Sequence, residues 1–230
     1  MGLALLIIFM FVAYGLTTLC RRWIDIPTLL AVAIGCAVNA NIFHPYSAPI
    51  IVGPFTFSIE IVLYTLFMYT IIVRILDYSY EEAKVMTFTS IAAIVISAFI
   101  ELVAFMMTQG DALVALKSFS IYLFSSLGTI AGVWIMILIT ILCRKKNISP
   151  FLIIPFAIIP ASIIHAVFFY GGMFLVYQNV GDLNALLFGA LGTMIGKSIC
   201  ILLSIFCYFI NKKWWKPLNL IAKEEKNSDN

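Results

Sequence analysis

The stretch FLIIPFAIIPASIIHAVFFYGGMFLVY, residues 151–177, decides the fold class. It contains no Asp, Glu, Lys or Arg, and it is longer than the roughly 20 apolar residues that a helix needs to cross a bilayer core. In hydrocarbon every backbone N–H and C=O group must be paired within the segment, which a helix achieves. We therefore predict a transmembrane helix here.

The composition of the whole chain has the same character. Of its 230 residues, 63% are hydrophobic and only 11% are charged, and the mean hydropathy is +1.08. Soluble domains contain about 45–50% apolar and about 25% charged residues. This composition excludes a soluble globule, a disordered chain, a nucleic-acid-binding module and a disulfide scaffold.

Short clusters of Lys and Arg separate the apolar runs and so delimit the segments. We predict an all-α, polytopic bundle of about seven transmembrane helices, at residues 2–20, 26–43, 55–76, 85–107, 118–142, 151–177 and 184–210. No internal repeat or linker divides the chain. One transmembrane domain is expected over residues 1–222, followed by a polar tail at 223–230.

The basic residues also predict the orientation of the bundle. All but two of the fourteen Lys and Arg residues fall on one side of it, the exceptions being Lys117 and Lys197. By the positive-inside rule the N-terminus lies outside, the C-terminus is cytoplasmic, and the protein is a multi-pass protein of the plasma (inner) membrane. The first segment lacks a preceding basic residue and a cleavage site, so we interpret it as a retained helix rather than a signal peptide.

Ionisable residues inside the predicted helices are the candidates for function, because such groups are costly in hydrocarbon and usually face a cavity or a partner. At a rise of about 1.5 Å per residue, Glu60 and Glu101 lie roughly 8–10 Å inside the outer ends of their helices, and His165 and Lys197 lie near the midplane. A polar pocket that opens outward would use all of these and two asparagines, giving the substrate-binding set Asn39, Asn41, Glu60, Glu101, His165 and Lys197.

Each of these residues also has a purely structural interpretation. Glu101 and Lys197 can form a buried ion pair, Glu60 can reach the outer interface, and a histidine can serve as a hydrogen-bonded packing residue. Lys197 is the strongest candidate, because small and polar residues share its helical face and that face cannot point at lipid. These residues are Gly189, Thr193, Cys200 and Ser204.

The cysteines and the small residues point to packing. None of the five cysteines forms a CxxC pair, so neither a metal site nor a cofactor is predicted. Small residues four positions apart let helix backbones approach, either within the bundle or in docking of a partner protein. The pairs are Ala33 with Ala37, Gly128 with Gly132, and Gly192 with Gly196.

The chain carries no HExxH or GxSxG motif, and nothing in it nominates a serine to act with His165, so no enzyme is expected.

Three stretches resemble the vitamin uptake transporter family, whose members carry queuosine precursors. They are VNANI at residues 38–42, GPFTFSIEIVLYTLFMYTIIVRILDYSYEEAKVM at 53–86 and GTMIGKSICILLSIFCYFI at 192–210. The resemblance implies that Asn39 or Asn41, Arg74 and Lys197 take the family positions. His165 stands where the family has an acidic residue, and the family has six helices.

The resemblance implies import of a small solute, a queuosine precursor (a 7-deazaguanine) or a similar vitamin-like base. A carboxylate of Glu60 or Glu101 would accept the N1 and N2 hydrogens of the base, and Lys197 or His165 would donate to its carbonyl side. The alternative is an integral-membrane docking or assembly subunit, including a substrate-binding subunit that needs a separate energising partner. A homo-oligomer is left open, and the lipid bilayer is the expected environment.

The orientation can be tested with reporter fusions. We expect a reporter fused after Asn230 to be cytoplasmic and one inserted within residues 43–54 to be external, because the basic residues gather on one side. Enzymatic reporters that work on only one side of the membrane measure this. An external C-terminus would contradict the seven-helix topology.

Overall fold

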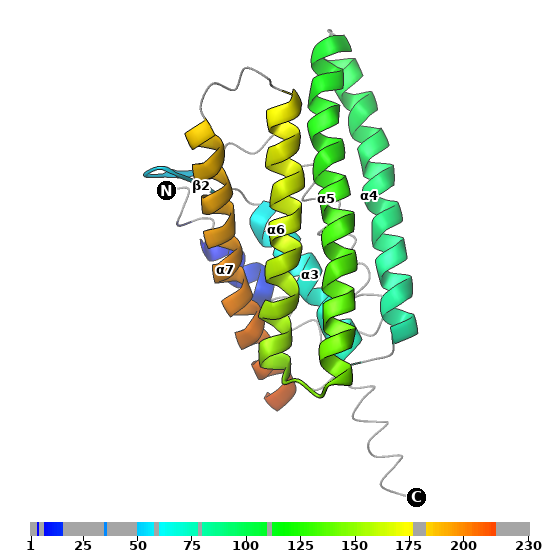
Figure 1. Ribbon diagram of the computed structural model, residues 1–230, viewed down its shortest axis with the longest axis vertical. Helices are drawn as coiled ribbons and strands as arrows, with labels where there is room; N and C mark the ends of the chain where they lie inside the picture. Colours follow the sequence, from blue (N-terminus) through cyan, green and yellow to red (C-terminus); the bar gives the residue numbers. More distant parts are fainter. Residues whose placement is uncertain are drawn as a thin grey trace, which may run out of the picture.

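The computed structural model describes residues 4, 7–15, 35, 50–57, 60–77, 80–109, 112–176 and 183–214. Within these ranges a helical segment at 7–15 and a β-hairpin accompany a bundle of long helices (Figure 1). The elements are β1 (Ile50–Val52), β2 (Phe55–Phe57), α3 (Glu60–Asp77), α4 (Tyr80–Gln109), α5 (Ala112–Lys145), α6 (Pro150–Val176) and α7 (Leu183–Trp214). Successive long helices alternate in direction, so the predicted helical bundle is confirmed in this part of the chain.

Four of the described helices are long and apolar enough to cross a membrane. The spans are Thr87–Ala104, Phe119–Lys145, Pro150–Val176 and Leu187–Ile210. They confirm the predicted segments from residue 85 onward. Their outer faces expose large apolar side chains such as Phe99 (63% exposed) and Leu202 (67%), as expected for helices that face lipid rather than water.

The first three predicted segments are only partly described. Helical structure covers residues 7–15 of the first, and Gly35 is the described residue of segment 26–43 and is helical. The number of seven helices therefore stays a prediction, as does the polar tail at 223–230, which lies outside the described residues.

The prediction that the third helix begins at residue 55 was wrong, because a hairpin occupies its start. β1 pairs antiparallel with β2, with Val52 opposite Phe55, which leaves Gly53 and Pro54 as a two-residue turn. Gly53 has φ +60°, and proline fixes a negative φ at the second turn position, which is the pattern of a type II′ hairpin turn. The helix starts at Glu60, where the carboxylate interacts favourably with the helix dipole.

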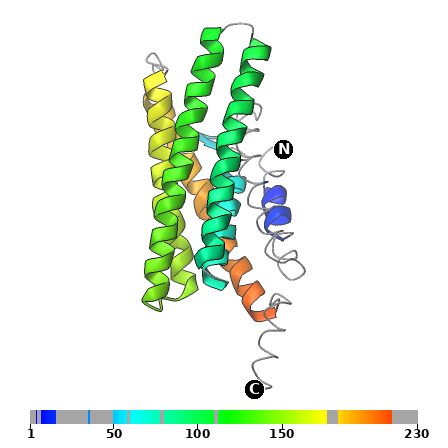
Figure 2. The ribbon, with the colours of Figure 1, turned by 90° about the vertical axis from the view of Figure 1, so that its right-hand side faces the viewer.

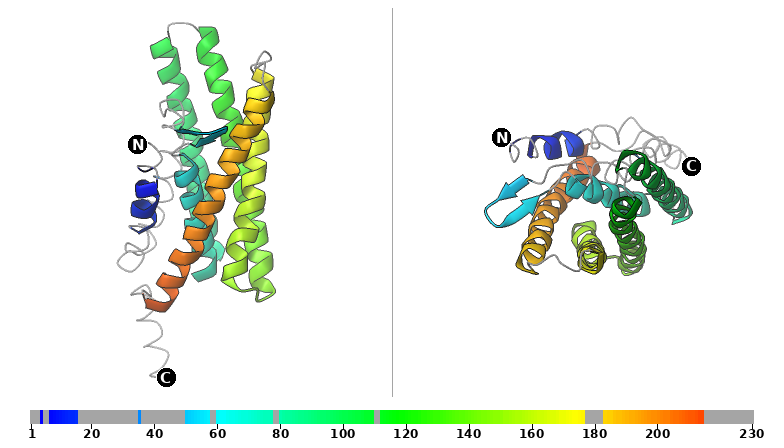
Figure 3. Two further views of the ribbon diagram at one scale, coloured as in Figure 1. Left: turned by 90° about the vertical axis from the view of Figure 1, so that its left-hand side faces the viewer. Right: turned by 90° about the horizontal axis from the view of Figure 1, so that it is seen from above.

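Helix α3 lies at the centre of the described bundle (Figure 3). Its side chains from Ile61 to Ile75 are buried without interruption, and it packs against α4, α5, α6 and α7. A helix that is apolar on every face must be enclosed by others. At its cytoplasmic end in the predicted orientation, Arg144 of α5 donates to the carbonyl oxygen of Ile75, which would otherwise lack a partner within the helix.

Helices α5 and α6 lie side by side (Figure 2), and their backbones approach closely at two glycines. A Cβ atom added at Gly132 would lie 2.8 Å from the carbonyl oxygen of Ala161, and one at Gly128 would lie 3.2 Å from the Cα atom of His165. Gly128 and Gly132 therefore serve packing within the bundle, as one of the two interpretations of this pair predicts.

Overpacking this contact should destabilise the protein. We expect Gly132→Ala to lower the free energy of unfolding by about 1–3 kcal/mol, because the new methyl group meets a helix backbone that cannot rotate away. Gly171→Ala on α6 is the matched control, since nothing lies within 4 Å of its added Cβ atom. Thermal unfolding of the purified variants in detergent measures both, and equal stability of the two would contradict the close contact.

Candidate functional site

Two of the predicted site residues, His165 and Lys197, come together between α6 and α7. The Nζ atom of Lys197 lies 3.4 Å from Nδ1 of His165. Lys197 is only 2% exposed. An amine buried to this extent is shielded from bulk water, and the imidazole is one of its polar contacts.

Tyr64 of α3 and Ser125 of α5 complete this cluster, which we call the lysine layer. The ammonium of Lys197 lies 4.3 Å from the centre of the Tyr64 ring, within the range of a cation–π interaction. The rings of Tyr64 and His165 are 4.5 Å apart, and Ser125 Oγ lies 3.3 Å from Nε2 of His165. Four helices thus contribute one side chain each to the layer.

Two contacts of the His165 ring, with Lys197 and with Ser125, indicate its protonation pattern. An ammonium can only donate hydrogen bonds, so Nδ1 must accept the bond from Lys197 while that amine is charged. A neutral ring then carries its hydrogen on Nε2, from which it donates to Ser125 Oγ.

The packing of α5 against α6 positions this ring. Because Gly128 has no side chain, the α5 backbone reaches the backbone of His165. Ser125 lies one turn before Gly128, and it is therefore brought beside the imidazole. Phe169, one turn beyond His165 on α6, stacks parallel to the ring at 6.2 Å.

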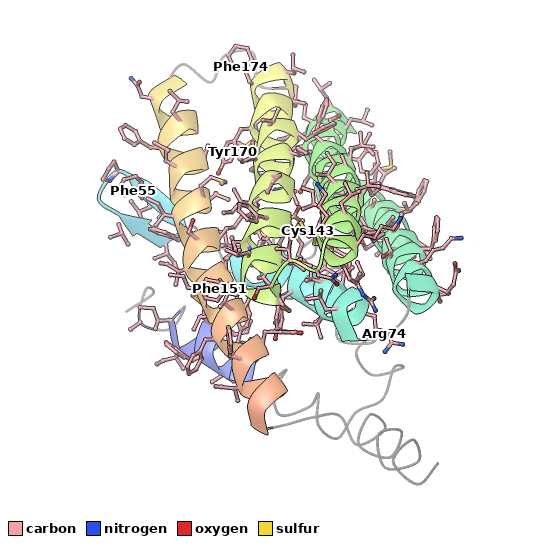
Figure 4. All side chains as sticks on the ribbon, turned by 60° about the horizontal axis from the view of Figure 1, so that its bottom comes forward. Phe55, Arg74, Cys143, Phe151, Tyr170 and Phe174 are labelled. Atoms are coloured by element: carbon pink, nitrogen blue, oxygen red, sulfur yellow. The ribbon has the colours of Figure 1, made fainter. Side chains whose placement is uncertain are left out.

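A second polar layer lies one helical turn further toward the outer side in the predicted orientation. The Tyr170 hydroxyl is 2.8 Å from Thr193 Oγ1, and Glu60 lies near enough to the same hydroxyl to interact with it electrostatically. Figure 4 shows Tyr170 between α6 and α7. Glu60 and Thr193 each lie four residues before a member of the lysine layer, about 6 Å along their helices.

The predicted inward face of α7 is confirmed. Gly189, Cys200 and Ser204 are buried, and Thr193 bonds to Tyr170. Ser204 contacts the hydroxyl of Tyr14 at 3.1 Å, so the segment at residues 7–15 covers the lower part of this face.

The remaining predicted site residues are not placed in this cluster. Asn39 and Asn41 lie outside the described residues, as does the side chain of Glu101 on α4. The ion pair of Glu101 with Lys197 therefore stays a prediction. Arg74, which the family resemblance implies, is 1% exposed in the last turn of α3, ten residues from Tyr64 along the helix.

Sequence reasoning missed Tyr64, Ser125 and Tyr170. The available signal was helical spacing, since Tyr64 follows Glu60 by four residues and Ser125 precedes Gly128 by three. Hydroxyl side chains are common in apolar helices, however, and spacing alone does not select these. Among the described residues no group of three or more His, Cys, Asp or Glu side chains is arranged to hold a metal ion.

Comparison with family profiles, with curated protein sequences and with solved structures gave no match.

Replacing Lys197 should separate a functional from a structural role. No carboxylate contacts Lys197 among the described side chains, so Lys197→Met leaves no buried charge behind, and we expect an unchanged or raised unfolding temperature. If a hidden ion pair with Glu101 held the fold, the variant would lose about 3–5 kcal/mol. Lys145→Met, at an exposed position, is the control for removing a cation.

Proposed function

We propose that the protein is a membrane transporter that imports a small solute, and that the lysine layer binds it. In this proposal the chain is a multi-pass protein of the plasma membrane, with seven helices and an external N-terminus. The solute is a queuosine precursor or a similar 7-deazaguanine base, as the family resemblance implies. The observation that carries the proposal is the burial of Lys197 among α3, α6 and α7 without a carboxylate partner among the described side chains.

Lys197 has donors to spare for a solute. Its ammonium offers three N–H groups, of which His165 Nδ1 takes one, while the Tyr64 ring offers a π face. A carbonyl oxygen on the solute would accept a second. Such a charge-assisted bond is strong where water is excluded, so a buried lysine can select ligands that carry an acceptor.

Glu60 provides a hydrogen-bond acceptor for the solute, whereas Lys197 provides a donor. Glu60 lies in the outer polar layer, about 6 Å from Tyr64 along α3, and its carboxylate can accept a pair of adjacent N–H groups. A donor in one layer and an acceptor in the next match a ring that carries a carbonyl group beside N–H groups, as a deazaguanine does. The aromatic rings of Tyr64 and Phe169 add apolar surface beside His165.

The contact between Ser125 and His165 does not favour a hydrolase. A serine nucleophile needs a histidine that accepts its proton, and a carboxylate that stabilises the resulting imidazolium. Here the other ring nitrogen faces Lys197, whose positive charge opposes an imidazolium. We therefore keep the interpretation that the protein is not an enzyme.

The alternative function, a docking subunit, depends on small-residue faces that are free to bind a partner. In the described part of the chain two of these faces are occupied by the bundle. Gly128 and Gly132 contact α6, and a Cβ atom at Gly196 would lie 3.1 Å from Ile61 of α3. Ala33 and Ala37 lie outside the described residues. This use of the glycines favours transport, with or without an energising subunit or a second copy of the chain.

Uptake of labelled deazaguanine by cells with and without the gene tests the proposal. We expect uptake to depend on the gene and Lys197→Met to weaken it roughly ten- to a hundredfold, since a charge-assisted hydrogen bond contributes about 1.5–3 kcal/mol. Lys145→Met should transport normally. Equal uptake by cells that lack the gene would contradict the cargo, and full uptake by Lys197→Met would contradict the site.

A further inference from the structure

The His165–Lys197 contact joins two basic groups inside an apolar bundle. Each can bind a proton, yet their nitrogen atoms lie 3.4 Å apart. A hydrogen bond between them needs one donor and one acceptor, so the contact is compatible with a single positive charge and not with two. Two cations at this separation in a poorly screened interior would repel strongly.

The groups around the pair set the energy of that charge. Among the described side chains, Tyr64 on α3, Ser125 on α5 and Cys200 on α7 face it, and Glu60 on α3 and Tyr170 on α6 lie one turn further along. Among them only Glu60 is a carboxylate, and it lies in the outer layer rather than against Lys197. When the site holds no solute, burial therefore disfavours a charge on the pair.

A solute changes this balance. Its acceptor oxygen hydrogen-bonds the ammonium and replaces the water that the ion lost, so a bound solute favours the charged pair. Binding of the proton then favours binding of the solute, and the reverse also holds. The site therefore holds both the proton and the solute when it is loaded, and it holds neither when it is empty.

From this geometry we propose that the His165–Lys197 pair binds one proton together with the solute, so that the protein couples solute import to proton import. The inference rests on the proposed transport function. In each cycle a proton passes from external water to a lone pair of the His165–Lys197 nitrogens, and then to internal water when the solute leaves. No other bond is made or broken.

The test uses the purified full chain in liposomes that contain a pH-sensitive dye, with labelled deazaguanine outside. The membrane potential is held at zero with potassium and valinomycin. With the outside one pH unit more acidic than the lumen, coupling of one proton to one solute should accumulate the base about tenfold. Solute entry without a pH gradient should acidify the lumen.

The outcomes separate the two proposals. Uptake that stops at equal concentrations and leaves the luminal pH unchanged would overturn proton coupling while transport stands. No uptake at all, from a protein shown by its unfolding temperature to be folded, would overturn the proposed function and the coupling with it. Since these measurements use the unmodified protein, they do not depend on whether a variant folds.

The two histidines of the chain offer a matched pair of variants. In His165→Gln the amide oxygen can still accept a hydrogen bond from Lys197 but cannot bind a proton, so Lys197 alone would carry the charge. The dependence of gradient-driven accumulation on external pH should therefore shift from that of the unmodified protein, while exchange of labelled for unlabelled base at equal pH continues. His44→Gln should behave as the unmodified protein. A pH dependence of accumulation by His165→Gln equal to that of His44→Gln would overturn the assignment of the pair.

Discussion

The structure of the candidate site depends on the backbone contact between α5 and α6. Gly128 and Gly132 leave no room for even a methyl group against Phe168 and Ala161. This contact brings Ser125 to the imidazole and holds the ring where Lys197 reaches it from α7. These two glycines therefore permit the close helix approach on which the site geometry depends.

Around this contact, the buried polar side chains of the described bundle lie on the inward helix faces and the exposed large apolar side chains on the outward faces. α3 is enclosed on all sides, and its polar residues either hydrogen-bond within the helix, as Thr65 and Thr70 do, or contact neighbouring helices. The outer faces of α4 to α7 expose large apolar side chains, as expected for helices that face lipid. Tyr64 and Glu60 lie on successive turns of α3, opposite Lys197 and Thr193 on successive turns of α7. Helical periodicity thus turns two short sequence patterns into two stacked polar layers.

When Lys197 is protonated, the groups of the lysine layer solvate its ammonium only weakly. An imidazole nitrogen and an aromatic face stabilise an ammonium less than water does, so the described site resembles a binding site that awaits an acceptor. The same arrangement argues against hydrolysis, because a triad needs a carboxylate where this site has a basic amine. The proposed coupling would link protonation and solute recognition through this one pair of nitrogen atoms.

The sequence by itself determined the helical class, four spans from residue 85 onward and the inward face of α7, because hydrophobicity and helical spacing are local properties. It did not determine the hairpin at 50–57, where Gly53 and Pro54 interrupt an apolar run that also suits a helix. Nor did it show that His165 lies beside Lys197. Only the tertiary structure decided that, because which residues meet across helices depends on how closely and at what rotation the helices pack.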